Sequence, residues 1–229
     1  MKHDGLARWA GPAGLAFAIS VLAQNLFAQA AHIEPKNDAN GATIVAKFAD
    51  QAGATGALVG WVALNMVILG VFLAAAYSRF RTTGPGWSRL ALIGGIMLMA
   101  LEPLVNVPLI VLAVNGDKLA DSPRLAEVLW QLHLAIFGYE GIALGLTLLG
   151  VTMAAVAAGH APRWFGSLAT LGAASLVLAS TLVQPITDGS AVTFVGAIGF
   201  VIWLVVLAVI SVNLWRQAPR ESEVIPAPV

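Results

Sequence analysis

Six long apolar runs constrain the fold of this chain more than any other feature. Each run is longer than the about 20 residues that a helix needs to cross the hydrocarbon core of a bilayer, and only Glu102 and Glu140 interrupt them. The runs are continuously apolar, whereas barrel strands would alternate over about 10 residues. The sequence therefore predicts an all-α fold, a polytopic membrane helix bundle with six transmembrane helices. We place these helices at residues 11–32, 56–78, 90–114, 126–158, 164–186 and 191–215.

The composition agrees with a membrane protein and excludes several other classes. Charged residues make up 10% of the 229 residues and hydrophobic residues 59%, whereas a soluble domain has about 25% charged residues. The 12 basic residues are balanced by 12 acidic ones, which argues against a nucleic-acid binder. The chain has no cysteine, which excludes disulfides, thiolate metal sites and cysteine nucleophiles. We expect one domain over residues 1–216 and a short disordered cytoplasmic tail over residues 217–229.

The basic residues predict the orientation in the membrane. With six helices both termini lie on one side, and Lys and Arg are enriched on the cytoplasmic side of bacterial membrane proteins. We therefore expect a multi-pass protein of the bacterial inner membrane with both termini in the cytoplasm. Trp87 and Trp164 suit an aromatic belt at the inner interface, and Trp61 and Trp130 suit one at the outer interface. The basic residues on the side of the termini are Lys2, Arg8, Arg79, Arg81, Arg89, Arg163, Arg216 and Arg220, against Lys36, Lys47, Lys118 and Arg124 on the other.

Two carboxyl groups lie near the middle of predicted membrane helices. Glu102 is in the third helix and Glu140 in the fourth, and a short loop joins these helices, so we expect them to be neighbours. An ionisable group inside a bilayer is unfavourable and marks a candidate functional site. Two carboxyls in one apolar site suit proton coupling, cation binding or general acid chemistry. The alternative is a neutral carboxyl that is hydrogen-bonded within the bundle.

Further polar residues share helix faces with these carboxyls or lie towards the outer surface. Asn106 follows Glu102 by four residues, and Glu140 follows His133 by seven, so the members of each pair lie on one face. We expect a polar pocket that opens to the outer side, with Glu102 and Glu140 as its floor. The candidate ligand-binding or proton-coupling residues are Glu102, Glu140, His133, Asn106, Asn65 and Asn25.

Cofactor and catalytic motifs give little further direction. A haem would need two facing histidines, and only His133 lies well inside a span; a metal site with two glutamates stays open, without HExxH-type spacing. The sequence therefore leaves the cofactor unknown and assigns no metal ligand. No lysine lies in a span, which argues against a retinal Schiff base. Hydroxyls within spans, such as Ser20 and Thr147, typically bond to helix carbonyls, and Gly141 and Gly145 suit packing between helices.

Two short segments carry a family resemblance. They are Leu132-His133 in the fourth helix and Ala161-Pro162-Arg163-Trp164-Phe165-Gly166-Ser167-Leu168 at the start of the fifth. Together with the six spans and a long first outer loop, this arrangement resembles a bacterial six-span integral membrane family catalogued only as a domain of unknown function. The resemblance supports the architecture and implies no activity, substrate or cofactor.

Three functions fit these residues. The leading hypothesis is that the protein binds or translocates a small molecule or cation through the pocket, with Glu102 and Glu140 as protonatable groups. The first alternative is a membrane-embedded enzyme that uses His133 and Glu140 on a lipid or apolar substrate. The second is a non-catalytic structural or sensory subunit. The expected partners are the lipid bilayer and a small-molecule or cation ligand, with no nucleic acid, and the sequence does not give the oligomeric state.

Overall fold

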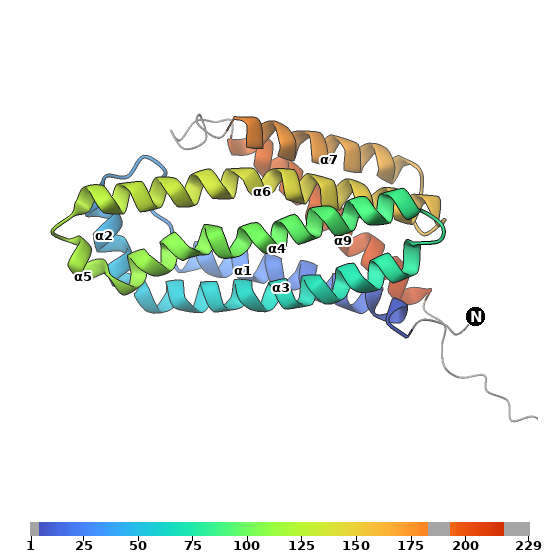
Figure 1. Ribbon diagram of the computed structural model, residues 1–229, viewed down its shortest axis with the longest axis horizontal. Coiled ribbons are helices and arrows are strands. Elements are labelled where there is room, and N and C mark those ends of the chain that lie inside the picture. The colour runs from blue at the N-terminus through green and yellow to red at the C-terminus, as the bar shows by residue number, and fades with distance from the viewer. Residues whose placement is uncertain (1–4, 183–192, 218–229) are drawn as a thin grey trace, which may run out of the picture.

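The computed structural model describes residues 5–182 and 193–217, and every regular element in these ranges is a helix. Six of the helices are long and apolar enough to cross a membrane, which confirms the predicted bundle. The predicted end of the fifth helix at position 186 and start of the sixth at position 191 lie outside the described residues. The helices are η1 (Ala7–Trp9), α1 (Ala10–Ala30), α2 (Gly41–Asp50), α3 (Ala52–Phe80), α4 (Pro85–Val114), α5 (Gly116–Leu119), α6 (Pro123–Ala157), α7 (Trp164–Thr181) and α9 (Thr193–Arg216) (Figure 1).

Local sequence signals explain several helix boundaries. Proline stands first in α4 and α6, at Pro85 and Pro123, where its missing N–H removes no helical hydrogen bond. The Asn40 side chain accepts a hydrogen bond of 2.9 Å from the Thr43 N–H and so caps the start of α2. After α6 the chain turns at Gly159, whose φ of 73° is left-handed, a conformation that glycine adopts without strain.

The long helices form one bundle in which α4 and α6 lie side by side along most of their length (Figure 1). Around this pair, α1 packs against α3 and α9, and α7 packs against α6 and α9. Helix α9 runs obliquely, from beside α7 at one end to beside α1 at the other (Figure 1). We call the end of the bundle that carries α2 and α5 the capped end. The opposite end, where η1 and the last residues of α9 lie, is the terminal end.

Small residues let the central helices approach closely. A Cβ added to Gly94 of α4 would lie 2.6 Å from the backbone N of Thr147, and one added to Gly150 of α6 would lie 2.3 Å from that of Ala91. On another face of α6, a Cβ at Gly141 would lie 2.7 Å from the Leu176 carbonyl oxygen of α7. Gly141 therefore serves packing within the chain, as predicted. Close backbone approach replaces the hydrophobic driving force that helices lack inside lipid.

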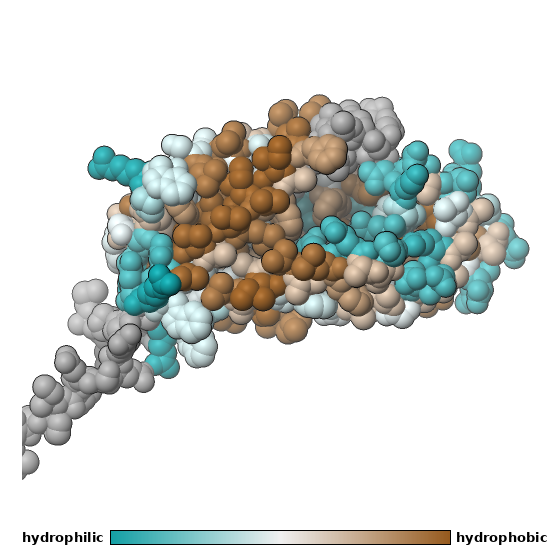
Figure 2. All heavy atoms as spheres, turned by 180° about the vertical axis from the view of Figure 1, so that it is seen from behind, coloured by the Kyte–Doolittle hydropathy of each residue, from teal (hydrophilic) through white to brown (hydrophobic). Residues whose placement is uncertain are grey.

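The surface has the polarity of a membrane protein. Figure 2 shows a hydrophobic band with hydrophilic residues gathered towards both ends of the bundle. Trp87 and Trp164 are exposed near the terminal end, as the predicted aromatic belt requires. The second belt is wrong for Trp130, which is only 1% exposed and packs inside the bundle. Trp61 is half-buried and donates a hydrogen bond of 2.8 Å to the Ser20 hydroxyl.

The segment between α1 and α3 contains a helix that was not predicted from the sequence. Helix α2 is amphipathic and buries Ile44, Val45 and Phe48 against the ends of α4 and α6. The Glu127 carboxylate of α6 accepts a hydrogen bond of 2.7 Å from the Gly41 N–H and so fixes the start of α2. We call the apolar cluster under α2 the α2 cap. Its buried members are Ile33, Ile44, Val45, Phe48, Leu58, Leu109, Leu112, Leu119, Ala126, Trp130 and Leu134.

Candidate functional site

Glu102 and Asn106 lie on one face of α4, as their spacing predicts. The Asn106 side-chain amide donates to the Glu102 backbone carbonyl at 2.7 Å and to the Glu102 carboxylate at 3.1 Å. Pro103, the next residue, has no N–H and so removes one hydrogen bond within the helix, yet α4 continues through both Pro103 and Pro108. The Asn106 amide therefore holds the Glu102 side chain against its own helix.

Glu140 of α6 is the other carboxyl in the centre of the bundle. It is only 4% exposed, and its Oε1 atom has no hydrogen-bond partner among the described residues. The carboxyl groups of Glu140 and Glu102 lie close enough to interact electrostatically. A buried acceptor without a partner is unfavourable by about 1–3 kcal/mol. The pair is therefore an anionic or proton-sharing centre that can accept hydrogen bonds from a bound group.

His133 is tied to the same two helices by its ring. Its Nδ1 atom donates a hydrogen bond of 2.9 Å to the Val105 carbonyl of α4, which requires the proton on Nδ1. The imidazole stacks between two aromatic rings of α6, with centroids 5.0 Å away at Trp130 and 6.2 Å away at Phe137. At 5% exposure, His133 is a hydrogen-bonded residue of the core that links α6 to α4 above the carboxyls.

Asn65 belongs to a polar network between α1 and α3. Its side chain accepts a hydrogen bond of 2.6 Å from the Ser20 hydroxyl and donates one of 2.6 Å to the Gln24 side chain. The Trp61 indole donates to Ser20 in turn. Asn65 was predicted as a site residue and Gln24 was not, although Ser20 and Gln24 are four residues apart and so share a face of α1. Ser20 bonds to this network, whereas Thr147 bonds to the helix carbonyl of Ala143 as expected.

Asn25 lies near the capped end of α1, where the surface is hollowed. Its side-chain amide donates a hydrogen bond of 2.9 Å to the Val21 carbonyl of its own helix. Beside it lies an open depression of about 540 Å³. His32, two residues after the end of α1, has a φ of 50° and is exposed. The residues that line the depression are Asn25, Ala28, Gln29, His32, Glu34 and Pro35.

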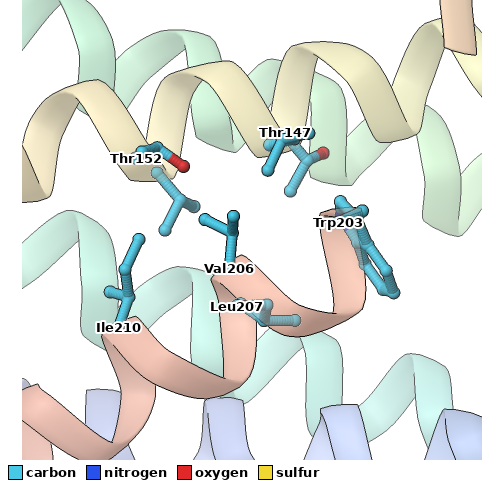
Figure 3. A pocket seen from close by; sticks show the side chains of 8 residues that line it. Thr147, Thr152, Trp203, Val206, Leu207 and Ile210 are labelled. Atoms are coloured by element: carbon cyan, nitrogen blue, oxygen red, sulfur yellow. The ribbon is translucent and has the colours of Figure 1, made fainter. Parts of the chain in front are cut away.

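A second, much smaller gap lies between α6 and α9 on the terminal side of Glu140. It has a volume of about 10 Å³ and is lined mainly by apolar side chains, among them Trp203 and Ile210, with Thr147 and Thr152 from α6 (Figure 3). This is room for one water at most. The Thr152 hydroxyl is buried there without a hydrogen-bond partner among the described residues. The gap is too small for a ligand and holds no ionisable group, whereas Glu140 has a buried oxygen without a hydrogen-bond partner among the described residues.

The described residues contain no group of three or more His, Asp or Glu side chains that could hold a metal ion. Glu102 and Glu140 come from two helices, and the nearby His133 already uses Nδ1 for Val105. The chemistry of this centre is therefore that of two carboxyls, one amide and an apolar surrounding. Such a centre favours a cation or a hydrogen-bond donor as its ligand.

At the terminal end, His160 joins three segments of the chain. Its Nε2 atom accepts a hydrogen bond of 3.3 Å from the Arg79 guanidinium, and its Nδ1 donates to the Gln217 side chain. Both bonds need the neutral ring with its proton on Nδ1. Burial lowers the pKa of His160 below its usual value, with the Gln217 hydrogen bond opposing and the positive charge of Arg79 adding to the decrease. The sequence analysis did not select this residue.

We expect this histidine to make the protein less stable in acid. Because the pKa of His160 is lower in the folded chain, the unfolded chain binds more protons below about pH 6.5, and stability falls as the pH falls through that range. The melting temperature in mild detergent should therefore drop between about pH 8 and about pH 5. The variant His160→Gln should show a smaller drop. An unchanged pH dependence in His160→Gln would contradict this assignment.

Comparison with known proteins places the chain in a family. A family model described as a domain of unknown function (DUF4386) matches residues 10–208. The chain matches no curated protein and no solved structure. The matched range starts at the first residue of α1 and ends within α9, so it includes the carboxyl pair, five membrane helices in full and most of the sixth. The chain therefore belongs to the family described as a domain of unknown function (DUF4386).

Proposed function

We propose that this multi-pass membrane protein binds a small molecule or cation at Glu102 and Glu140 and carries it into or across the bilayer. The observation that carries the proposal is the Glu140 carboxyl, which is 4% exposed and has an oxygen without a hydrogen-bond partner among the described residues. Packing alone does not need a second carboxyl beside it, because two like charges repel each other more strongly in an apolar surrounding. A cation or a hydrogen-bond donor between the two groups would supply the missing partner of Glu140 and reduce the repulsion between the carboxylates.

The placement of His133 supports binding rather than histidine-based catalysis. Its Nδ1 atom is engaged by the Val105 carbonyl, and its ring is stacked on Trp130. A general acid or base needs to reach the reacting group. The ring is instead part of the packing between α4 and α6, above the centre where Glu140 lies. The same packing would keep the carboxyl pair at a fixed separation.

The proposal also includes the orientation of the protein. Arg79, Arg89 and Arg163 all lie at the terminal end, next to the exposed Trp87 and Trp164. Basic residues beside interfacial tryptophans are typical of the cytoplasmic face. We therefore assign the terminal end to the cytoplasmic side of a bacterial inner membrane and the capped end to the outer side.

Replacement of Glu140 by glutamine tests the proposed site. The probe is methylammonium, the smallest organic cation with three N–H donors, and its binding to purified protein in nanodiscs is measured at several pH values. In the natural protein binding should saturate and weaken in acid, because protonated carboxyls no longer attract a cation. In Glu140→Gln we expect affinity to fall about tenfold or more, with an unchanged helical circular-dichroism spectrum.

Asp121→Asn is the matched control, since it removes a carboxylate that is exposed in the loop at the capped end. It should bind methylammonium as the natural protein does. Equal binding by Glu140→Gln and the natural protein would refute the assignment of the site. Loss of binding in Asp121→Asn to the same degree would show that overall charge, rather than the central pair, attracts the probe.

A further inference from the structure

The capped end offers no straight route to the carboxyl pair. Trp130 stands on α6 at the outer side of Glu140, and it is 1% exposed. Ile44 and Phe48 of α2 are each 0% exposed and cover it in the α2 cap. The Trp130 indole donates a hydrogen bond of 3.2 Å to the Lys36 carbonyl, which ties the loop to this plug. A ligand that came straight down between α4 and α6 would have to displace the whole α2 cap.

Glu102 is nevertheless more exposed than its place on α4 predicts. Residues four before, three after and seven after it share its face at 100° per residue. These are Leu98, Val105 and Leu109, which are 2%, 3% and 2% exposed. Glu102 is only half-buried, although it lies in the middle of this inward face. The Glu102 side chain is therefore partly accessible from outside the bundle.

Phe137 of α6 is likewise more exposed than its neighbours on the same helix face. It lies on the face between His133, four residues before, and Glu140, three residues after, which are 5% and 4% exposed. Leu134 on its other side is 8% exposed. Phe137 itself is 56% exposed. Phe137 therefore presents an accessible aromatic ring beside two buried residues of the candidate site.

The oblique course of α9 leaves the bundle more loosely covered towards the capped end (Figure 1). In the terminal half α9 covers α1 closely: the rings of Phe17 and Trp203 meet edge to face at 5.7 Å, and a Cβ on Gly14 would lie 2.3 Å from the Ser211 hydroxyl. Asn25 follows Gly14 by 11 residues, about three helical turns, and so continues the same face of α1. It is half-buried, because α9 has by then turned towards α7 (Figure 1).

The space-filling view agrees with this course. Figure 2 shows the molecule from the side of α1 and α9, and there the surface is hollowed next to hydrophilic residues. The depression lined by Asn25 and Gln29 lies at the capped end of α1. The hollow in Figure 2 faces sideways rather than along the bundle axis.

We propose that the ligand of this site is an amphiphilic amine that enters from the membrane between α1 and α9. The inference rests on the proposed function and names the substrate class of that site. Its ammonium group donates hydrogen bonds to the Glu140 and Glu102 carboxylates, which supply the complementary charge. Its hydrocarbon part lies along Phe137, whose exposed ring also attracts the cation at close range. An inorganic ion would make no apolar contact with Phe137, and it would not partition into the hydrocarbon from which this ligand enters.

Two probes and one aromatic residue test this proposal. Dodecylammonium and methylammonium carry the same head group, and their binding to the protein in nanodiscs is measured against empty nanodiscs to remove partitioning into lipid. We expect dodecylammonium to bind at least about tenfold more tightly, and Phe137→Ala to remove most of that preference. Phe137→Leu keeps an apolar side chain at this position and should leave the protein folded. It should retain part of the preference for dodecylammonium. The control Phe194→Ala changes a ring on α9 that is 73% exposed, and should alter neither affinity.

The binding results distinguish the amphiphilic ligand from the proposed binding of a cation at the carboxyl pair. Equal affinity for both probes, with both weakened by Glu140→Gln, would overturn the amphiphile and leave the carboxyl site standing. Tighter binding of dodecylammonium that Phe137→Ala and Phe137→Leu both leave unchanged would overturn the contact with Phe137. Failure of both probes to bind above empty nanodiscs would overturn the inference together with the proposed function.

Discussion

Replacement of Gly150 by alanine should destabilise the protein by about 2–3 kcal/mol, although alanine is the better helix former. The added Cβ would lie 2.3 Å from the backbone N of Ala91 and 2.7 Å from its Cα. These are backbone atoms, which cannot turn aside as a side chain can. The two central helices α4 and α6 would have to separate, and the separation would spread to the contact between Gly94 and Thr147. The measurement is the free energy of unfolding in mixed detergent micelles.

Gly60→Ala is the matched control for this prediction. Gly60 is also inside a membrane helix, α3, but it is exposed and no atom lies within 4 Å of an added Cβ. There the helix propensity of alanine should act alone and stabilise the protein by up to about 1 kcal/mol. Equal effects of the two substitutions would contradict the close packing of α4 on α6. Opposite signs would confirm it.

The six membrane helices were predictable because the length of an apolar run is a property of the sequence alone. Helix α2 was not predicted, since its ten residues are too few to stand out from a polar loop. Its signals were nevertheless present in the cap residue Asn40 and in the spacing of Ile44 and Phe48, which places both on one face. What no local pattern could supply was the partner of that face, the Trp130 side chain of α6.

The candidate site was predictable where its residues share one helix. The hydrogen bond between Asn106 and Glu102 follows from their spacing of four. Contacts between helices depend on how each helix is rotated about its axis, which packing decides. This is why the partners of Asn65 and of His133, Gln24 and Val105, could not be named beforehand. The oblique course of α9, which leaves one side of the bundle open, depends on packing in the same way.

Replacement of Trp130 by alanine should have an effect at least as large as that of Gly150→Ala, about 3–5 kcal/mol. The indole is 1% exposed, packs against the Phe48 and His133 rings, and holds the Lys36 carbonyl. Its loss leaves a cavity under α2 and frees the loop that precedes that helix. Amide hydrogen exchange over residues 41–50 should therefore rise sharply, together with the fall in unfolding free energy.

Two further variants separate the contribution of the Lys36 hydrogen bond from that of the buried ring and test whether the effect is specific to Trp130. Trp130→Phe keeps a ring in the α2 cap but loses the hydrogen bond to Lys36, so it should cost about 1 kcal/mol. Trp164→Ala removes an indole that is 62% exposed near the terminal end, and it should leave exchange in α2 unchanged. If α2 exchanged no faster in Trp130→Ala, the α2 cap would not depend on this residue. The axial route to Glu140 would then be closed by something other than the α2 cap.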